Sequence, residues 1–424
     1  MLEIQTLSNL LNAELTIPGS KSITNRALII ASLAEGKSVI KNALESDDTI
    51  YLREGLNRLG VKIEIKNGDI IVHGRGGKFD APKEKIFVGN AGTAMRFLTA
   101  LSSLVPGKVI VTGNERMQTR PIGDLLLALN QLGISAISEK RNGCPPIIIH
   151  GSFLSGGKIE IKGDVSSQFL SAILMIAPLA KHPISIRING ELVSKSYADL
   201  TSQIMTTFGA EIKNDNYQWF SINNTRLYQT REFIVEADAS SATYFLAAAA
   251  ITGGKIKILN WNPHSVQGDT SFVDVLIKMG CKIQKTTTTL EIIGPKKLSP
   301  LGKIDLNSMP DAVPTLAITA AFCAGYTEIR NVANLRVKET DRIKALVTEL
   351  NKIGATAKEL PDGLEIIGNP DKLHGAEIET YDDHRIAMSF AIAGLKIPEI
   401  KIKNPACVNK SFPEFWEKLK LVSK

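Results

Sequence analysis

The stretch NRALIIASLAEGKSVIKN, residues 25–42, contains the unit from which this chain is built. Its apolar, alanine-rich run predicts a buried helix, Gly36 marks a turn, and the residues after it predict a strand. Five further copies follow, each starting about 70 residues after the last. They read MRFLTALSSLVPGKVIVTG (95–113), SQFLSAILMIAPLAKHPISIRI (167–188), SATYFLAAAAITGGKIKILN (241–260), AVPTLAITAAFCAGYTEIRN (312–331) and RIAMSFAIAGLKIPEIKIKN (385–404). The chain is therefore predicted to consist of duplicated structural units.

A second helix follows in most copies and ends at a glycine before another strand, as in LREGLNRLGVKI (52–63) and LVTELNKIGATA (346–357). Each unit then holds two helices and several short strands, which predicts the α/β class. Six such units exceed one hydrophobic core, so two groups of three are expected, with a boundary near residues 231–244. The sequence has no low-complexity linker, and short crossovers between two lobes favour hinge closure over a cleft.

The composition is that of a soluble globular protein, with 44% apolar and 22% charged residues in a chain of 424. The net charge is +7, but the lysines are spread out and lack interleaved aromatic residues, which argues against nucleic acid and for acidic small substrates. The four cysteines have neither zinc nor disulfide spacing. The start of the chain lacks a basic signal region, and no stretch reaches the roughly 20 apolar residues of a membrane span. We therefore expect a cytoplasmic protein without a membrane partner.

The segment PGSKSITNRAL, residues 18–28, introduces the first apolar helix with two cations, Lys21 and Arg26. A helix N-terminus attracts anions, so this start predicts a phosphate or carboxylate site. The alternative is a plain N-cap by Ser20, Ser22 or Thr24, with both cations facing water. The spacing of a nucleotide-binding P-loop is absent.

Similar polar breaks open the next two copies. VGNAGTAMRF (88–97) has small residues that let backbone N–H groups approach an anion, with a tight strand-to-helix turn as the alternative. It matches no dinucleotide fingerprint. In NERMQTRPIGDLL (114–126), Pro121 suits the first position of a helix, which would place the guanidinium of Arg120 at the helix start; a solvated loop is the alternative. DVSSQFLSA (164–172) and LVSKSYADL (192–200) offer hydroxyls and Gln168 for a polyol or phosphate, although Ser-Ser is also a routine cap.

The last three copies add carboxylates to the cations. The residues in question come from MPDAVPTLA, NLRVKETDRIKAL, YDDHRIAM and NKSFPEF: Asp311, Arg336, Lys338, Glu339, Asp341, Arg342, His384, Arg385 and Lys410. Each could be a solvated helix end, and Asp341 fits that alternative. Asp-Asp-His could hold a metal, but the adjacent Arg385 would repel a cation, so no metal site is expected.

These breaks recur at the same place in successive units, at the start of the apolar helix. Such helix starts can converge on one cleft, and arginine binds carboxylate or phosphate through a fixed fork of donors. The pattern therefore predicts substrates with several negative charges, with Asp311 and Glu339 available for proton transfer.

The polar breaks and their flanking residues form nine motifs: PGSKSITNRAL, GNAGTAMRF, RPIGDL, SSQFLSA, LVSKSY, PDAVPT, NLRVKETDR, DDHRIAM and NKSFPEFW. Over nearly the whole chain, these motifs resemble the 5-enolpyruvylshikimate-3-phosphate synthase family. The resemblance implies an inside-out α/β barrel, the enolpyruvyl transferase fold, with two lobes of three βαβαββ-type units around a helical core. Lobe one would be residues 1–18 with 236–424, lobe two residues 19–235, and the active site would lie in the cleft between them. The implied reaction moves the enolpyruvyl group of phosphoenolpyruvate to the 5-hydroxyl of shikimate 3-phosphate, with neither metal nor organic cofactor, in a monomer.

The resemblance also implies residue roles. Shikimate 3-phosphate would be bound by Lys21, Ser22, Arg26, Ser166, Ser167, Gln168, Ser194, Tyr197, Asp311, Asn334 and Lys338. Phosphoenolpyruvate would be bound by Lys21, Asn90, Gly92, Arg120, Gln168, Arg342, Arg385 and Lys410. Asp311 would be the base on the 5-hydroxyl, Glu339 the acid that protonates the methylene carbon, and Lys21 an aid to proton transfer, with His384 as a further candidate.

Three positions differ from residues that are common in the family. Phe97 replaces a common Pro, Leu335 a common Trp, and Ser196 a common Pro. Two alternatives stay open at this point. A UDP-N-acetylglucosamine enolpyruvyl transferase would have Asn after Lys21 and usually a Cys in the loop before Arg120, whereas this chain has Ser22 and no Cys there. A non-catalytic repeat scaffold with a basic face would leave the pair Asp311 and Glu339 unexplained.

Overall fold

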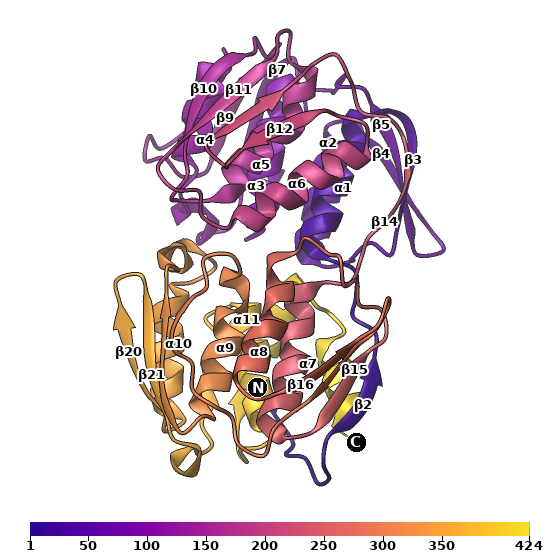
Figure 1. Cartoon of the computed structure of the whole chain (residues 1–424). Coiled ribbons are helices and arrows are strands. Elements are labelled where there is room, and N and C mark those ends of the chain that lie inside the picture. The colour runs from indigo at the N-terminus through magenta and orange to yellow at the C-terminus, as the bar shows by residue number, and fades with distance from the viewer. Residues whose placement is uncertain (424) are drawn as a thin grey trace. The chain divides into compact units, whose positions relative to one another are not determined.

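The computed structural model describes residues 1–423, and these residues form two compact units (Figure 1). Unit 1 comprises Met1–Pro18 and Glu236–Lys424, and unit 2 comprises Gly19–Val235. Residues 1–18 belong to unit 1 because their strands pair there: Asn12–Leu15 (β2) runs parallel to Lys255–Ile258 (β15), and Leu2–Glu3 (β1) pairs with Lys401–Ile402 (β23).

Unit 2 contains three four-stranded sheets with one common topology, in which the first two strands are parallel and the other neighbours antiparallel. The first sheet has the order β14 (Glu232–Ile234), β3 (Glu35–Lys41), β5 (Asp69–Arg75), β4 (Lys62–Lys66). The second has β6 (Ile86–Phe87), β7 (Gly107–Thr112), β9 (Ile147–Gly151), β8 (Ser135–Ser138). The third has β10 (Gly157–Lys162), β11 (Ile184–Asn189), β13 (Trp219–Ile222), β12 (Ile212–Asp215).

Unit 1 repeats this topology in two four-stranded sheets and a shorter third one. The four-stranded sheets have the orders β2, β15, β17 (Leu290–Ile293), β16 (Lys282–Lys285) and β18 (Gly302–Asp305), β19 (Gly325–Arg330), β21 (Gly363–Gly368), β20 (Thr356–Leu360). The third has β22 (Glu377–Ile378), β23 and β1. The third sheet therefore keeps the parallel pair, and the single strand β1 takes the place of the hairpin.

The six predicted apolar helices form the core of the two units, three in each. They are α1 (Lys21–Leu33), α3 (Gly92–Leu101), α5 (Ser167–Ile176), α7 (Ala239–Thr252), α9 (Val313–Ala321) and α11 (His384–Gly394). Every residue of α3, α9 and α11 is buried, as expected of a helix that is apolar on all sides. In unit 1, α7, α9 and α11 pack against one another (Figure 1).

The second helices lie on the outside of these cores and bury one face only. They are α2 (Asp47–Arg58), α4 (Gly123–Gln131), α6 (Lys195–Thr207), α8 (Phe272–Lys278) and α10 (Arg342–Lys352), and α12 (Phe415–Val422) follows the sixth copy. Each of the first five is followed by a glycine with positive φ: Gly60, Gly133, Gly209, Gly280 and Gly354. The predicted α/β class and its helix–glycine–strand copies are confirmed.

One predicted helix start is wrong. Pro121 was expected at the first helical position, but α4 begins at Gly123, and Arg120 instead directly follows the short 3-10 helix Met117–Thr119. The backbone N–H of Ile122 bonds to the carbonyl of Gly143, so the loop around Gly143 fixes this segment before the helix begins. None of the helices described within residues 1–423 has the length and apolar character that a membrane crossing needs.

Candidate active site

In unit 2, the N-terminal halves of the three core helices lie together. The side chain of Gln168 donates to the hydroxyl of Thr93 at 3.5 Å, which joins the starts of α5 and α3. Arg26 of α1 donates to the hydroxyl of Ser171 in α5 at 3.1 Å, and its guanidinium lies 5.3 Å from the ring centroid of Phe97 in α3. The polar residues that open the first three copies therefore share one end of unit 2.

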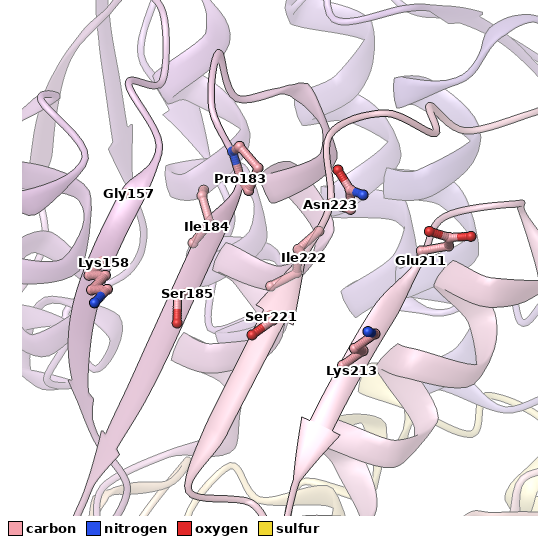
Figure 2. Close-up of a pocket in the computed structure, with 10 residues that line it drawn as sticks. All are labelled: Gly157, Lys158, Pro183, Ile184, Ser185, Glu211, Lys213, Ser221, Ile222 and Asn223. Carbon is pink, nitrogen blue, oxygen red and sulfur yellow. The ribbon is translucent and has the colours of Figure 1, made fainter.

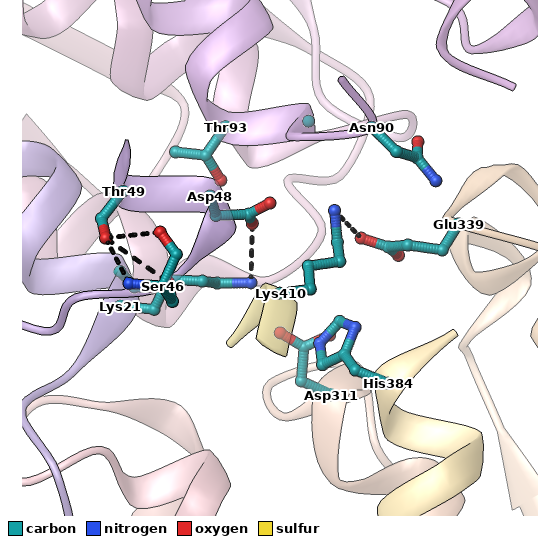
Figure 3. Close-up of polar contacts among 12 residues, drawn as sticks. Lys21, Ser46, Asp48, Thr49, Asn90, Thr93, Asp311, Glu339, His384 and Lys410 are labelled. Carbon is teal, nitrogen blue, oxygen red and sulfur yellow. Dashed lines mark hydrogen bonds and ion pairs between the residues drawn. The ribbon is translucent and has the colours of Figure 1, made fainter. Parts of the chain in front are cut away.

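The start of α1 is not a plain capped helix. Ser20 occupies the N-cap position, but its side chain makes no capping hydrogen bond. Lys21 does not point freely into water: its ammonium lies 3.2 Å from a carboxylate oxygen of Asp48, and their side chains are 13% and 3% exposed (Figure 3). Asp48 lies in the first turn of α2, behind the Ser46–Thr49 capping box. The alternative in which a cap explains this stretch and its cations face water is wrong.

Arg26 is 1% exposed, and the acceptors that surround it are uncharged. Its donors reach the hydroxyls of Thr201, at 2.7 Å, and Ser171, and the backbone carbonyls of Ser22 and Tyr197. The rings of Phe97 and Tyr197 face the guanidinium at 5.3 and 5.6 Å, a favourable cation–π distance. Burial lowers the pKa of Arg26 to about 10, which leaves it cationic near pH 7.

Arg120 is held against the start of α3. Its guanidinium donates to both the carbonyl and the side-chain oxygen of Asn90 at 3.1 Å. A Cβ added at Gly92 would lie 2.5 Å from Nη2 of Arg120, so only glycine leaves room for this guanidinium. Arg96 supports the same loop by donating to the carbonyl of Pro121 at 2.8 Å. Asn90, Gly92 and Arg120 thus form one contiguous group.

The hydroxyl-rich segments lie on α5 and α6. Ser166 caps α5 by accepting from the backbone N–H of Gln168 at 3.3 Å, so the capping alternative holds for this serine. Ser167 follows as the first residue of α5 and is buried. Ser194, the N-cap residue of α6, has φ of 55° and is also buried, and Tyr197 lies one turn into α6 beside Arg26.

In unit 1, the buried Arg342 at the start of α10 binds three carboxylates. Its Nε donates to Asp383 at 2.7 Å, Nη2 to Glu339 at 2.8 Å, and Nη1 to Asp311 at 3.1 Å. Burial acts to lower the pKa of Arg342, but the charges of Asp383, Glu339 and Asp311 outweigh it and raise the pKa. Arg342 therefore connects both carboxylates that the sequence singled out.

Asp311 lies in the 3-10 turn Pro310–Ala312, directly before α9. One of its oxygens accepts from Arg342 and the other from Nη2 of Arg385 at 2.8 Å. Glu339 lies 3.5 Å from the ammonium of Lys410, which ends the 3-10 helix Pro405–Lys410 (Figure 3). In unit 1, the predicted base Asp311 and the predicted acid Glu339 are therefore bonded to the predicted cations in one network.

The remaining predicted residues of unit 1 flank this network. Asn334 lies in the 3-10 helix Ala333–Val337. Lys338 is the next residue after this helix and directly precedes Glu339. His384 is the first residue of α11 and is fully buried, with Nδ1 3.8 Å from a carboxylate oxygen of Asp383. Asp341 caps α10 by accepting from the N–H of Lys344, as the helix-end alternative predicted.

The structure also brings in groups that sequence reasoning did not single out. Asp383 was considered only as part of a metal motif, yet it is the closest carboxylate to Arg342. Asp269 is buried and accepts from the hydroxyl of Ser240. Burial, followed by the charge of Asp311, raises the pKa of Asp269 to about 7. The hydroxyl of Tyr244 accepts from Arg385 at 3.4 Å, and its burial raises its pKa to about 12, against the opposing charge of Arg385.

A separate hollow of about 540 Å³ lies on the outer face of the sheet β10–β11–β13–β12 (Figure 2). Its lining includes Lys158, Ser185, Lys213 and Ser221 and none of the predicted site residues. None of its polar side chains is buried, whereas ligand sites orient their ligands with enclosed polar groups. The hollow is therefore not the candidate active site.

The core helices begin beside cations in both units, beside hydroxyls in unit 2 and beside paired carboxylates in unit 1, as the resemblance to the enolpyruvyl transferase class implies. A family model described as EPSP synthase (3-phosphoshikimate 1-carboxyvinyltransferase) matches residues 6–419. The chain belongs to this family, and it is a transferase of the shikimate pathway.

Curated relatives and solved structures agree with this assignment. A 3-phosphoshikimate 1-carboxyvinyltransferase of Marinomonas sp. is 47% identical over 409 residues, with 96% of each chain covered. That of Proteus mirabilis is 46% identical over 428 residues, with 100% of this chain and 99% of the relative covered. The structure of EPSP synthase from Acinetobacter baumannii matches with a TM-score of 0.82 at 28% identity, covering 99% of this chain and 97% of that one. The predicted fold and family are confirmed.

Proposed function

We propose that this chain transfers the enolpyruvyl group of phosphoenolpyruvate to the 5-hydroxyl of shikimate 3-phosphate and releases phosphate. Family membership supports the activity. The observation that carries the residue assignment is the network around Arg342, where Asp311 and Glu339 bind one guanidinium at 3.1 and 2.8 Å. A general acid and a general base must flank the reacting carbon, and a shared cation keeps these two carboxylates close together.

The residues of unit 2 are proposed to bind anionic and hydroxyl groups. Arg26, buried among uncharged acceptors and two aromatic rings, supplies a positive charge for shikimate 3-phosphate. The hydroxyls at the starts of α5 and α6, on Ser166, Ser167 and Ser194, suit a phosphate at a helix N-terminus. Arg120 beside Asn90 and Gly92 is proposed to bind phosphoenolpyruvate.

The residues of unit 1 are proposed to bind phosphoenolpyruvate and to move protons. Arg342 and Arg385 both donate to Asp311, so a carboxylate or phosphate that takes their donors competes with Asp311 for them. This competition would release Asp311 to act as a base when phosphoenolpyruvate binds. Lys410, 3.5 Å from Glu339, is proposed to help bind the anionic substrate beside the acid.

The chemistry follows as addition and elimination. Glu339 donates a proton to the methylene carbon of phosphoenolpyruvate, and the adjacent carbon becomes cationic. Asp311 accepts the proton of the 5-hydroxyl of shikimate 3-phosphate. The oxygen of that hydroxyl attacks the cationic carbon, which gives a tetrahedral intermediate. The carboxylate of Glu339 then takes a proton back from the new methyl group, the C–O bond to phosphate breaks, and the double bond is restored. Lys21 is proposed to assist a proton transfer. That the enzyme is cytoplasmic, monomeric and independent of metals and organic cofactors remains a prediction.

The test is phosphate release from phosphoenolpyruvate with no second substrate, with shikimate 3-phosphate, or with UDP-N-acetylglucosamine. We expect release only with shikimate 3-phosphate. Release with the nucleotide sugar would support the alternative transferase, and no release in any arm would contradict catalysis.

Asp311→Asn should abolish most of the release, and Asp341→Asn provides the matched control. That control makes the same chemical change in the same unit, at an N-cap that Asn also fills. Equal activity of the two variants would remove Asp311 from the proposed role.

A further inference from the structure

The buried carboxylate of Glu349 is not among the predicted site residues. It belongs to α10, two turns after Arg342, and is fully buried although the helix faces solvent on its other side. One oxygen accepts from the hydroxyl of Tyr381 at 2.6 Å, and the other accepts from the backbone N–H of Glu379 at 3.1 Å. Lys352 supplies the counter-charge at 2.8 Å from both oxygens. A buried carboxylate with this set of donors is fully satisfied.

The partners of Glu349 lie on the segment that enters α11. Tyr381 and Asp382 have φ values of 53° and 56°. Residues other than glycine seldom adopt this left-handed conformation, and two in succession persist only where the surroundings hold them. The hydrogen bonds from Tyr381 and from the backbone of Glu379 to Glu349 supply such a hold.

This segment leads directly to the candidate active site. Asp383 follows the two left-handed residues, caps α11 through the N–H of Arg385, and binds Nε and Nη2 of Arg342 at 2.7 and 3.3 Å. Helix α10 therefore holds the segment at two points, through Arg342 at its start and Glu349 two turns later. A shift at Tyr381 would be transmitted to Asp383 and from there to both arginines.

We propose that Glu349 is a positioning residue, which through Tyr381 sets the placement of Arg342 and Arg385 for the anionic substrate. This inference rests on the proposed function, in which these arginines bind phosphoenolpyruvate. It separates the bonds that Glu349 makes to this segment from its ion pair, in which the ammonium of Lys352 donates to both carboxylate oxygens.

The decisive variant is Tyr381→Phe, which removes one hydroxyl and keeps the ring. We expect the KM for phosphoenolpyruvate to rise about tenfold, which lies within the range by which residues remote from a ligand modulate its binding. The KM for shikimate 3-phosphate should rise clearly less than that for phosphoenolpyruvate, since Arg342 and Arg385 are proposed to bind phosphoenolpyruvate directly and reach the other substrate only through Asp311. A purely structural role would lower the folded fraction without this difference between substrates.

Two controls isolate the contact. Tyr326→Phe removes the hydrogen bond from a tyrosine to Glu328 on β19, which is the same chemical change in the same unit, and should leave both KM values unchanged. Lys352→Gln removes the ion pair and keeps both contacts to the segment, and should change the phosphoenolpyruvate KM less than about twofold. A defect in Lys352→Gln equal to that of Tyr381→Phe would overturn the inference.

Hydrogen exchange gives a readout that does not depend on activity. The N–H of Asp383 bonds to the carbonyl of Thr380 at 2.8 Å, and the N–H of Arg385 to Asp383 at 2.9 Å. In Tyr381→Phe, we expect faster exchange in a peptide that covers residues 379–387, with no change there in Tyr326→Phe. Unchanged exchange overturns the inference even if the enzyme is active. The proposed function fails separately: it is contradicted if the wild-type chain releases no phosphate when shikimate 3-phosphate and phosphoenolpyruvate are both present.

Discussion

The guanidinium of Arg120 lies so close to Gly92 that adding one methyl group, in Gly92→Ala, tests the proposed role of Arg120 in binding phosphoenolpyruvate. In Gly92→Ala the new Cβ would lie 2.5 Å from Nη2 of Arg120. An unstrained contact needs about 3.5 Å, so the guanidinium must retreat by about 1 Å. A displacement of that size at a binding group can reduce catalysis by up to about 100-fold. We expect kcat/KM for phosphoenolpyruvate to fall by about 10- to 100-fold.

The fold should tolerate this change because the clash is with the flexible end of a side chain. Gly92 is the first residue of α3 and lacks a positive φ, so its backbone conformation is one that alanine also adopts. The melting temperature should therefore stay constant or rise. Gly123→Ala is the matched control, since Gly123 is the first residue of α4 and its nearest neighbour would lie 3.7 Å from the added Cβ. Phosphate release measured against phosphoenolpyruvate concentration decides between them, and equal kinetics for the two variants would refute the placement of Arg120.

Three further predictions follow from the two units. Glu339→Gln keeps shape and removes the proton, so single-turnover phosphate release should slow by at least about 100-fold while substrate binding persists; near-normal release would contradict the acid role. Arg120→Lys should raise the KM for phosphoenolpyruvate, because a point charge cannot replace a planar fork, and a change only in the shikimate 3-phosphate KM would contradict it. Burial and Asp311 raise the pKa of Asp269 from 3.8 to about 7. The folded state therefore binds this proton more tightly, and the resulting stability is present below about pH 4 and lost as the pH rises through about 7. Asp269→Asn should flatten the dependence of melting temperature on pH in this window, and an unchanged slope would show that Asp269 does not cause it.

The helices and turns of the repeats were predictable because their signals are local. A continuously apolar run predicts a buried helix, and a glycine after an amphipathic run predicts its end, as at Gly60 and Gly354. The start of α4 was not predictable from Pro121, because the contact of Ile122 with the distant Gly143 fixes that turn.

The candidate site was predictable in its residue types and not in its contacts. Lys21 and Arg26 stood out as cations in an apolar pattern, but nothing local identifies Asp48 as the partner of Lys21. Asp383 lies in a motif that also suggested a metal ligand, and only the fold brings it to Arg342. Glu349 has the spacing of the buried face of α10, seven residues after Arg342, but nothing local identifies Tyr381 as its partner. Tertiary contacts between segments far apart in sequence decide these cases.

The central claim is that the enolpyruvyl group is transferred by protonation of its methylene carbon and later loss of a proton. The most direct test is the mass spectrum of the product formed in D₂O from unlabelled phosphoenolpyruvate and shikimate 3-phosphate. The transient methyl group gains one deuterium from the exchangeable acid, and its later proton loss removes only one of three hydrogens. We therefore predict a product that carries the enolpyruvyl group with deuterium in its methylene carbon. An enolpyruvyl product without deuterium, or transfer of the phosphoryl group in place of the enolpyruvyl group, would contradict the account.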